Sequence, residues 1–78
     1  LEVGHSWVTT WAQNTLATIY AHRGEQAKLQ LIMQEIVPLT INYKQYYIFT
    51  LSNLGHLAAM KNQIFEAKKY YQEAYALA

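Results

Sequence analysis

The chain has 78 residues, no cysteine and a formal net charge of +1. These values exclude disulfides and thiolate metal sites, and they argue against a strongly basic nucleic-acid surface. Hydrophobic residues make up 53% of the chain, but no apolar run reaches the roughly 18 residues that a membrane helix needs, and the first residues do not follow a signal-peptide pattern. We expect one small folded unit in the cytoplasm, with no membrane partner.

The first predicted helix begins at Trp7 and ends near Arg23. Ser6 is its candidate N-cap, and Gly24 is the residue type that closes a helix in the left-handed conformation. Its apolar residues recur at helical spacing: Trp7, Val8, Trp11, Ala12, Leu16, Ile19 and Tyr20.

A second predicted helix covers residues 25–37. Pro38 is expected to end it, because the proline ring cannot continue the helical hydrogen bonds. Residues 39–42 would then form a short connection. The apolar positions of this helix are Ala27, Leu29, Ile32, Met33, Ile36 and Val37.

A third helix is predicted from Tyr43 to about Met60, with Asn42 as its N-cap. Residues 46–49 alone could form a strand, but the helical period continues through them without a turn signal. The apolar positions are Tyr46, Tyr47, Phe49, Leu51, Leu54, Leu57 and Ala58.

A fourth helix, residues 63–78, follows the break at Lys61 and Asn62. Its apolar stripe comprises Ile64, Ala67, Tyr70, Tyr71, Ala74 and Leu77. The chain lacks an initiator Met and stops inside this helical pattern, so we interpret it as a piece of a longer protein.

The two halves of the chain resemble each other at an offset of 38 residues. Leu16 aligns with Leu54, Ala17 with Gly55, and Ile19 with Leu57. Gly24 aligns with Asn62, and both residue types tolerate the left-handed conformation. The pattern predicts two copies of a helix-turn-helix hairpin, in which small Ala17 and Gly55 allow the second helix to approach closely.

With these motifs the chain resembles the tetratricopeptide repeat (TPR) family. The second half carries Leu54-Gly55, Ala67, Tyr71 and Ala74 at the family's spacing, and the first half carries Leu16-Ala17, Tyr20 and Gly24. The chain departs from the pattern at Leu29, Met33 and Ile36, which are larger than the family's residues, and at Gln13 and Leu51, which occupy its tryptophan slot. Its period is also longer than the family's ~34 residues, and is similar to that of bacterial regulators with helical sensor domains.

The resemblance implies an all-α fold of two stacked antiparallel helix hairpins, residues 7–38 and 43–78, as a fragment of an α-solenoid. Two such hairpins leave their ends uncovered. We therefore expect a homo-oligomer or an exchange of helices between copies. The alternative is that Trp7 and Trp11 fold back and cover the first end.

In TPR proteins the first helix of each hairpin lines a concave binding face. Asn14 and Asn53 could then hold a peptide backbone, and Trp11 and Phe49 could supply apolar floors. The alternatives are hydrogen bonds between helices for the asparagines and core packing for the aromatic residues. The implied groove consists of Trp11, Asn14, Thr15, Thr18, His22, Phe49, Ser52, Asn53, His56 and Met60.

The sequence has no pattern typical of an enzyme. His5, His22 and His56 lack a second ligand at helical spacing, there is no aspartate, and there is no glycine-rich phosphate loop. We expect no catalysis, no metal and no cofactor.

A small basic patch comprises Lys61, Lys68 and Lys69, interleaved with tyrosines. Such a patch could bind single-stranded nucleic acid, but a solvated helix face explains it better.

The sequence therefore predicts a protein- or peptide-binding helical-repeat module without catalysis, within a larger regulator or scaffold. The alternative is a structural or self-associating repeat segment with no ligand of its own.

Overall fold

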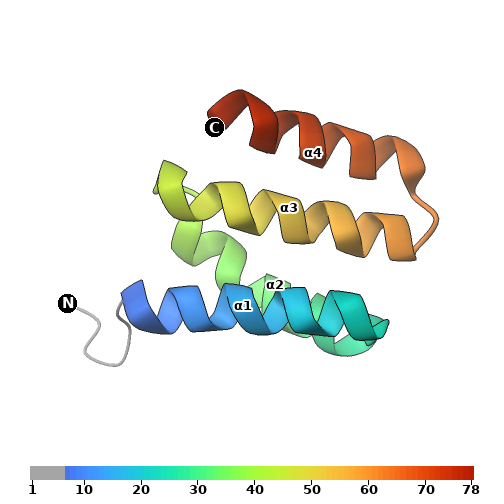
Figure 1. Cartoon of the computed structure of the whole chain (residues 1–78), viewed down its shortest axis with the longest axis horizontal. Coiled ribbons are helices and arrows are strands. Elements are labelled where there is room, and N and C mark those ends of the chain that lie inside the picture. Colours follow the sequence, from blue (N-terminus) through green and yellow to red (C-terminus); the bar gives the residue numbers. More distant parts are fainter. Residues whose placement is uncertain (1–6) are drawn as a thin grey trace.

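The computed structural model describes residues 7–78, and within this range it is all-α, with no strand. The helices are α1 (Trp7–Arg23), α2 (Gln26–Thr40), α3 (Lys44–Met60) and α4 (Ile64–Leu77), shown in Figure 1. The all-α prediction is confirmed, and the helix boundaries agree with the predicted ones to within a few residues. His5 and the predicted N-cap, Ser6, lie outside the described residues.

The two turns that close α1 and α3 have the same geometry. Gly24 has a φ of 72° and Asn62 a φ of 61°, which confirms the left-handed conformation expected at both positions. The Glu25 amide donates to the Tyr20 carbonyl at 2.9 Å, and the Gln63 amide donates to the Ala58 carbonyl at 2.8 Å. Both turns are Schellman motifs, which satisfy carbonyl groups that the end of a helix leaves free.

The prediction that Pro38 ends the second helix is wrong, because Pro38 lies inside α2. A proline removes only one helical hydrogen bond, and here it does so in the last turn. The turn is stabilised around it: the Ile41 amide donates to the Val37 carbonyl at 3.0 Å. The Thr40 hydroxyl also donates to the Ile36 carbonyl at 2.9 Å. The predicted connection 39–42 is correspondingly shorter.

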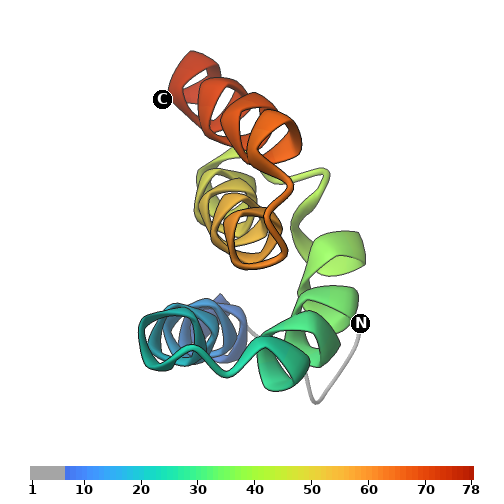
Figure 2. The same cartoon turned by 90° about the vertical axis from the view of Figure 1, so that its right-hand side faces the viewer.

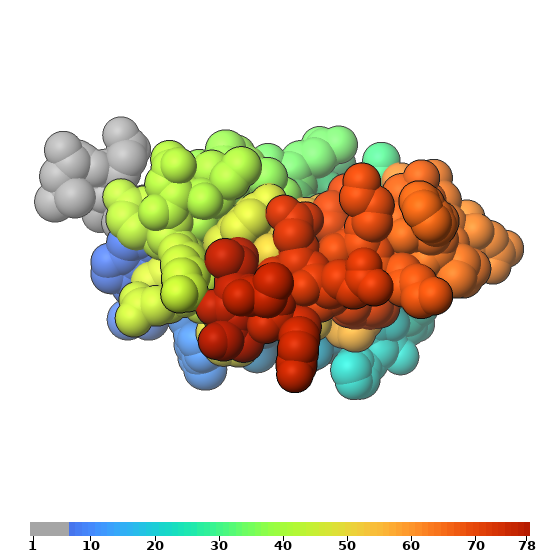
Figure 3. Space-filling view, turned by 90° about the horizontal axis from the view of Figure 1, so that it is seen from above, coloured from blue at the N-terminus to red at the C-terminus, as the bar shows by residue number. Residues whose placement is uncertain are grey.

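The helices pack in a curved arrangement. α1 and α3 lie side by side and run in the same direction, and α4 runs antiparallel to α3 (Figure 1). α2 lies to one side of the pair formed by α1 and α3, and it contacts both of them (Figure 2). Within the described residues, α4 contacts α3 and neither α1 nor α2. Seen from above, α4 covers the front of the molecule and no other helix lies over it (Figure 3).

The main apolar core lies where α1, α2 and α3 meet. Its buried residues are Ala17, Leu29, Met33, Ile36 and Leu57. Ala17 is fully buried, as its predicted role in close packing requires. At Gly55 an added Cβ would lie 2.7 Å from Cδ1 of Tyr71, so the absence of a side chain makes room for the ring that α4 places there.

The predicted apolar face of α1 is not its buried face, whereas that of α4 contains all the residues that α4 buries or half-buries. In α1 the buried residues are Thr10, Asn14 and Ala17, whereas the expected stripe is largely exposed: Trp7, Val8, Trp11, Leu16 and Ile19. In α4 the predicted stripe includes buried Ala67 and half-buried Tyr70, Ala74 and Leu77, on a helix that contacts α3. The most exposed apolar side chains of α4 are Ile64, Phe65 and Tyr75.

Candidate functional site

A pocket of about 160 Å³ lies between α1 and α3. The two helices run in the same direction, so side chains spaced three and four residues apart on each of them form adjacent rows. Seven of the ten predicted groove residues line this pocket together with Tyr46. Its lining is Trp11, Asn14, Thr15, Thr18, Tyr46, Phe49, Ser52 and Asn53.

Two aromatic residues of the pocket are largely exposed to solvent. Trp11 on α1 is 62% exposed, and Phe49 on α3 is 56% exposed. The alternative assignment of both side chains to the core therefore does not describe this structure. Large apolar side chains at the rim of a concave site are typical anchors for a binding partner.

Tyr46 lines the pocket although the sequence did not indicate it. It lies three residues before Phe49, and this helical spacing is the signal that could have identified it. Its ring stacks on Trp7, with centroids 4.3 Å apart and planes inclined by 4°. Trp7 also meets Tyr43 edge-on, at 4.7 Å between centroids. Trp7 thus holds the aromatic wall of the pocket in place.

The floor of the pocket is a buried amide pair. The Asn53 side-chain amide donates to the Asn14 side-chain oxygen at 3.1 Å and to the Asn14 backbone oxygen at 3.2 Å. The Thr18 hydroxyl lies 3.1 Å from Oδ1 of Asn53 and 3.0 Å from the Asn14 backbone oxygen. Asn14 is 6% exposed and Asn53 is 2% exposed. Both amides are engaged in interhelical hydrogen bonds, the alternative that the sequence left open.

These hydrogen bonds continue into α2. The Asn14 side-chain amide donates to the Thr50 hydroxyl at 3.3 Å, and the Thr50 and Thr40 hydroxyls lie 2.8 Å apart. Thr40 and Thr50 are fully buried. One buried polar network therefore connects α1, α2 and α3, and such a network makes the pocket floor rigid when its members are satisfied.

The remaining predicted groove residues, His22, His56 and Met60, lie outside the pocket lining. The His22 and His56 rings meet edge-on, with centroids 6.4 Å apart. The Tyr71 hydroxyl lies 2.9 Å from Nδ1 of His56. Burial, and then the nearby charge of His22, lower the pKa of His56 below its ordinary value. Burial raises the pKa of Tyr71, so near neutral pH its hydroxyl can donate to an unprotonated His56.

The described residues that line the pocket carry no formal charge. Lys61, Lys68 and Lys69 are exposed and none of them lines it. In the described part of the chain, no group of three or more His, Cys, Asp or Glu side chains could hold a metal ion. No helix among residues 7–78 combines the length and hydropathy that crossing a lipid bilayer requires.

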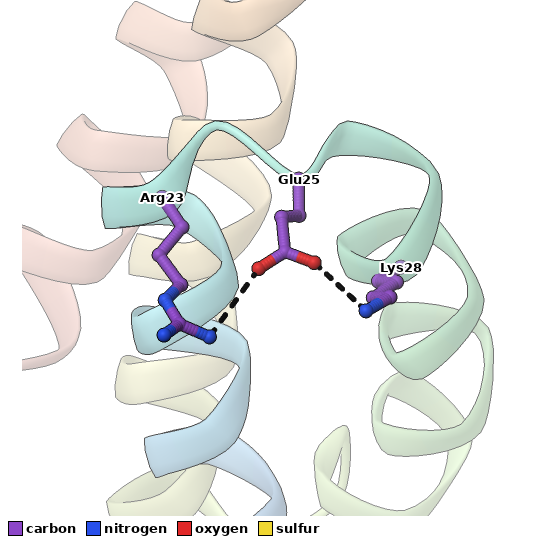
Figure 4. A network of polar contacts seen from close by, with 3 residues as sticks. All are labelled: Arg23, Glu25 and Lys28. Carbon is purple, nitrogen blue, oxygen red and sulfur yellow. Dashed lines mark ion pairs between the residues drawn. The ribbon is translucent and has the colours of Figure 1, made fainter.

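Ion pairs lie at the turn between α1 and α2 (Figure 4), and none of their residues lines the pocket. The Glu25 carboxylate is 2.9 Å from the Lys28 ammonium and 3.6 Å from the Arg23 guanidinium. The hydrogen bond from Lys28 is the main cause that lowers the pKa of Glu25. Because Arg23 and Lys28 are largely exposed, solvent screens both pairs. Their role is local, in the turn that joins the two helices.

No family model matches the chain, and no curated protein or solved structure is significantly similar to it.

Proposed function

We propose that this chain is a protein- or peptide-binding helical-repeat module of the TPR type, and that its pocket between α1 and α3 receives one apolar side chain of an extended ligand. The observation that carries the proposal is the pair of exposed aromatic residues, Trp11 and Phe49, at a concave site with a rigid polar floor. Apolar anchors surrounded by fixed polar groups are the usual composition of a recognition site.

The volume of the pocket favours a side chain over a whole metabolite. At about 160 Å³ it is smaller than the roughly 300–1,000 Å³ of typical small-molecule sites. Its lining lacks charge, so an uncharged side chain fits it better than an acidic or basic one, which would lose hydration without gaining a partner.

The asparagines have a supporting role in this proposal. Their amides bond to each other and to Thr18, so they position α1 against α3 instead of holding a peptide backbone. The hydroxyl-bearing residues Thr15 and Ser52 complete the polar part of the lining.

The TPR assignment rests on the repeated turn. Gly24 and Asn62 lie at the 38-residue offset and close their helices with the same hydrogen bonds. In this interpretation α1 and α2 form one hairpin, α3 and α4 form the next, and the pocket lies on the face lined by the first helices. A longer regulator or scaffold would then use this face to bind a protein segment.

The test is peptide binding by matched phenylalanine variants. Extended peptides selected from a random display library on the wild-type chain are measured by fluorescence anisotropy. Phe49→Ala should weaken binding by roughly tenfold or more, as loss of an anchor does. Phe65→Ala, which removes an exposed phenylalanine of α4 away from the pocket, should leave the Kd unchanged.

An unchanged Kd for Phe49→Ala, with helicity intact by circular dichroism, would contradict the proposal. Failure to select any peptide would favour the alternative, a structural segment with no ligand of its own. Substitution of Asn14 or Asn53 is a poor test, because loss of the interhelical hydrogen bonds would disturb the fold as well as the pocket.

A further inference from the structure

The contact between α2 and α3 shows how one hairpin of this chain can pack on the next. On α3, Leu57 is 8% exposed and Leu54 is half-buried, and both belong to the core that α2 helps to form. On α2, Met33 is 2% exposed and Val37 is half-buried in the same core. The apolar row of α3 is therefore covered where it meets α2.

The corresponding row of α1 is uncovered. At the 38-residue offset, Leu16 and Ile19 correspond to Leu54 and Leu57. They are 39% and 44% exposed, and Val8, on the same side of α1, is 75% exposed. We name the α1 outer face by its residues, Val8, Ala12, Leu16 and Ile19.

The row of α4 that corresponds to the covered row of α2 is also open. Tyr75 corresponds to Val37, yet Tyr75 is 86% exposed, and Ala78, which corresponds to buried Thr40, is exposed as well. We name Tyr75 and Ala78 the α4 outer face. Among the described helices only α3 contacts α4, and no helix lies on the opposite side of α4 in Figure 2 and Figure 3.

From this correspondence we infer that the α1 outer face of one copy of this chain docks on the α4 outer face of a second copy, as α3 docks on α2 within the chain. The two faces are the two halves of one repeated interface. Each copy carries one uncovered half on α1 and the other uncovered half on α4. A second copy is the partner that carries both halves of this interface.

The chemistry of the two faces agrees with this partner. The α1 outer face contains no charged side chain. The α4 outer face contains Tyr75, whose ring suits an interface, and the neighbouring Lys68 can lay its aliphatic stem along an apolar surface with its ammonium group in water. Burial of apolar side chains therefore drives the contact, with no charge left unpaired.

The interface is heterologous, because different surfaces of the two copies meet. A head-to-tail contact of this kind leaves one free face of each type in every assembly, so it grows into open chains unless its rotation closes a ring. A symmetric dimer, in contrast, would use the same surface of both copies.

The test uses two variants that each remove one face. Ile19→Lys places a charge in the α1 outer face, and Tyr75→Lys places one in the α4 outer face. In analytical ultracentrifugation the wild-type chain should associate beyond a dimer as its concentration rises. Each variant alone should show a dissociation constant at least about tenfold higher, because one of the two surfaces needed for every contact is damaged.

Mixing the variants separates this contact from other modes of association. The mixture should form a heterodimer and nothing larger, because Ile19→Lys retains an intact α4 outer face and Tyr75→Lys retains an intact α1 outer face. Restored association also shows that both variants fold. Leu31→Lys, at a residue of α2 that is 66% exposed and outside both faces, is the matched control and should associate as the wild type does.

Three results would overturn the inference. The first is a wild-type chain that stays monomeric up to roughly 100 μM, well above the micromolar range of ordinary interfaces. The second is a mixture of the two variants that does not associate. The third is a Leu31→Lys control that loses association to the same degree as the two face variants. None of them bears on the peptide pocket, because Phe49 lies outside both faces. Phe49→Ala should therefore associate like the wild type.

Discussion

At the scale of single residues, Thr50 is where the hydrogen bonds of three helices meet. Its hydroxyl receives a bond from the Asn14 amide, lies 2.8 Å from the Thr40 hydroxyl and reaches the Tyr46 carbonyl. Thr50 is fully buried, so no water can replace these partners. The position of α1 against α3, and with it the width of the pocket, depends on this hydroxyl.

We expect Thr50→Val to destabilise the protein by about 1–3 kcal/mol, because it keeps the shape of the side chain but leaves the Asn14 amide without its partner. Urea unfolding followed by circular dichroism measures the change. Thr15→Val is the control: the Thr15 hydroxyl donates to the Trp11 carbonyl in an exposed position, so its loss should change stability by less than about 0.5 kcal/mol. Equal effects of the two substitutions would show that the buried network is not important.

His56 should make the stability of the fold depend on pH. Burial lowers the pKa of His56 in the folded state, so the unfolded chain, with a pKa of about 6.5, takes up a proton first as the pH falls. Unprotonated His56 therefore contributes stability to the fold above about pH 6.5. This contribution is lost as the pH falls from about 6.5 towards the lower pKa of His56 in the folded state.

The urea midpoint should accordingly fall between about pH 7.5 and about pH 5.5, and the fall should be smaller in His56→Gln. Because burial is a larger cause of the shift than the charge of His22, His22→Gln should retain most of the pH dependence. Glu25 has a lowered pKa and titrates below this window. A His56→Gln variant with the wild-type pH profile would refute the expectation.

At the scale of helices, the contact between α3 and α4 is built around Gly55. The Tyr71 ring occupies the place of a Gly55 side chain, and its hydroxyl reaches His56 in the next position of the same helix. Glycine in a helix costs about 1 kcal/mol relative to alanine. The close approach of α4 is what offsets this cost.

Gly55→Ala therefore should have opposite effects in two backgrounds. In the wild type it should destabilise by about 1 kcal/mol, because overpacking of roughly 1–3 kcal/mol exceeds the gain in helix propensity. In Tyr71→Ala, where the ring is absent, the same substitution should stabilise by about 1 kcal/mol. Thermal unfolding of the four proteins measures both values, and the same sign in both backgrounds would disprove this account of Gly55.

At the scale of the whole molecule, coverage of the helices is uneven. α2 and α3 bury their apolar rows, but α1 and α4 leave Ile19 and Tyr75 exposed. A chain of this size buries only about 60% of the surface of its unfolded form, so a partner on these faces would add substantially to its stability. None of the residues that define the two outer faces lines the pocket, so binding and association are tested by different substitutions.

Much of the architecture could be predicted from the sequence because its signals are local. Gly24 and Asn62 predicted both left-handed turns, and apolar spacing predicted the helices. Seven of the ten predicted groove residues line the pocket: Trp11, Asn14, Thr15, Thr18, Phe49, Ser52 and Asn53. Pro38 gave a wrong boundary for α2, because a proline in the last turn removes only one helical hydrogen bond, and Thr40, which lies in that turn, bonds to the Thr50 hydroxyl of α3.

The sequence by itself determined that the chain forms helices and where they turn, since capping residues and spacing act within a few positions of the chain. Only the tertiary structure decided which side of α1 faces inward. The apolar row of Leu16 and Ile19 is exposed and the polar row of Thr10 and Asn14 is buried, because the amide and hydroxyl groups of Asn53 and Thr50 satisfy Asn14 from another helix. No local pattern can indicate such a partner 36 or 39 residues away.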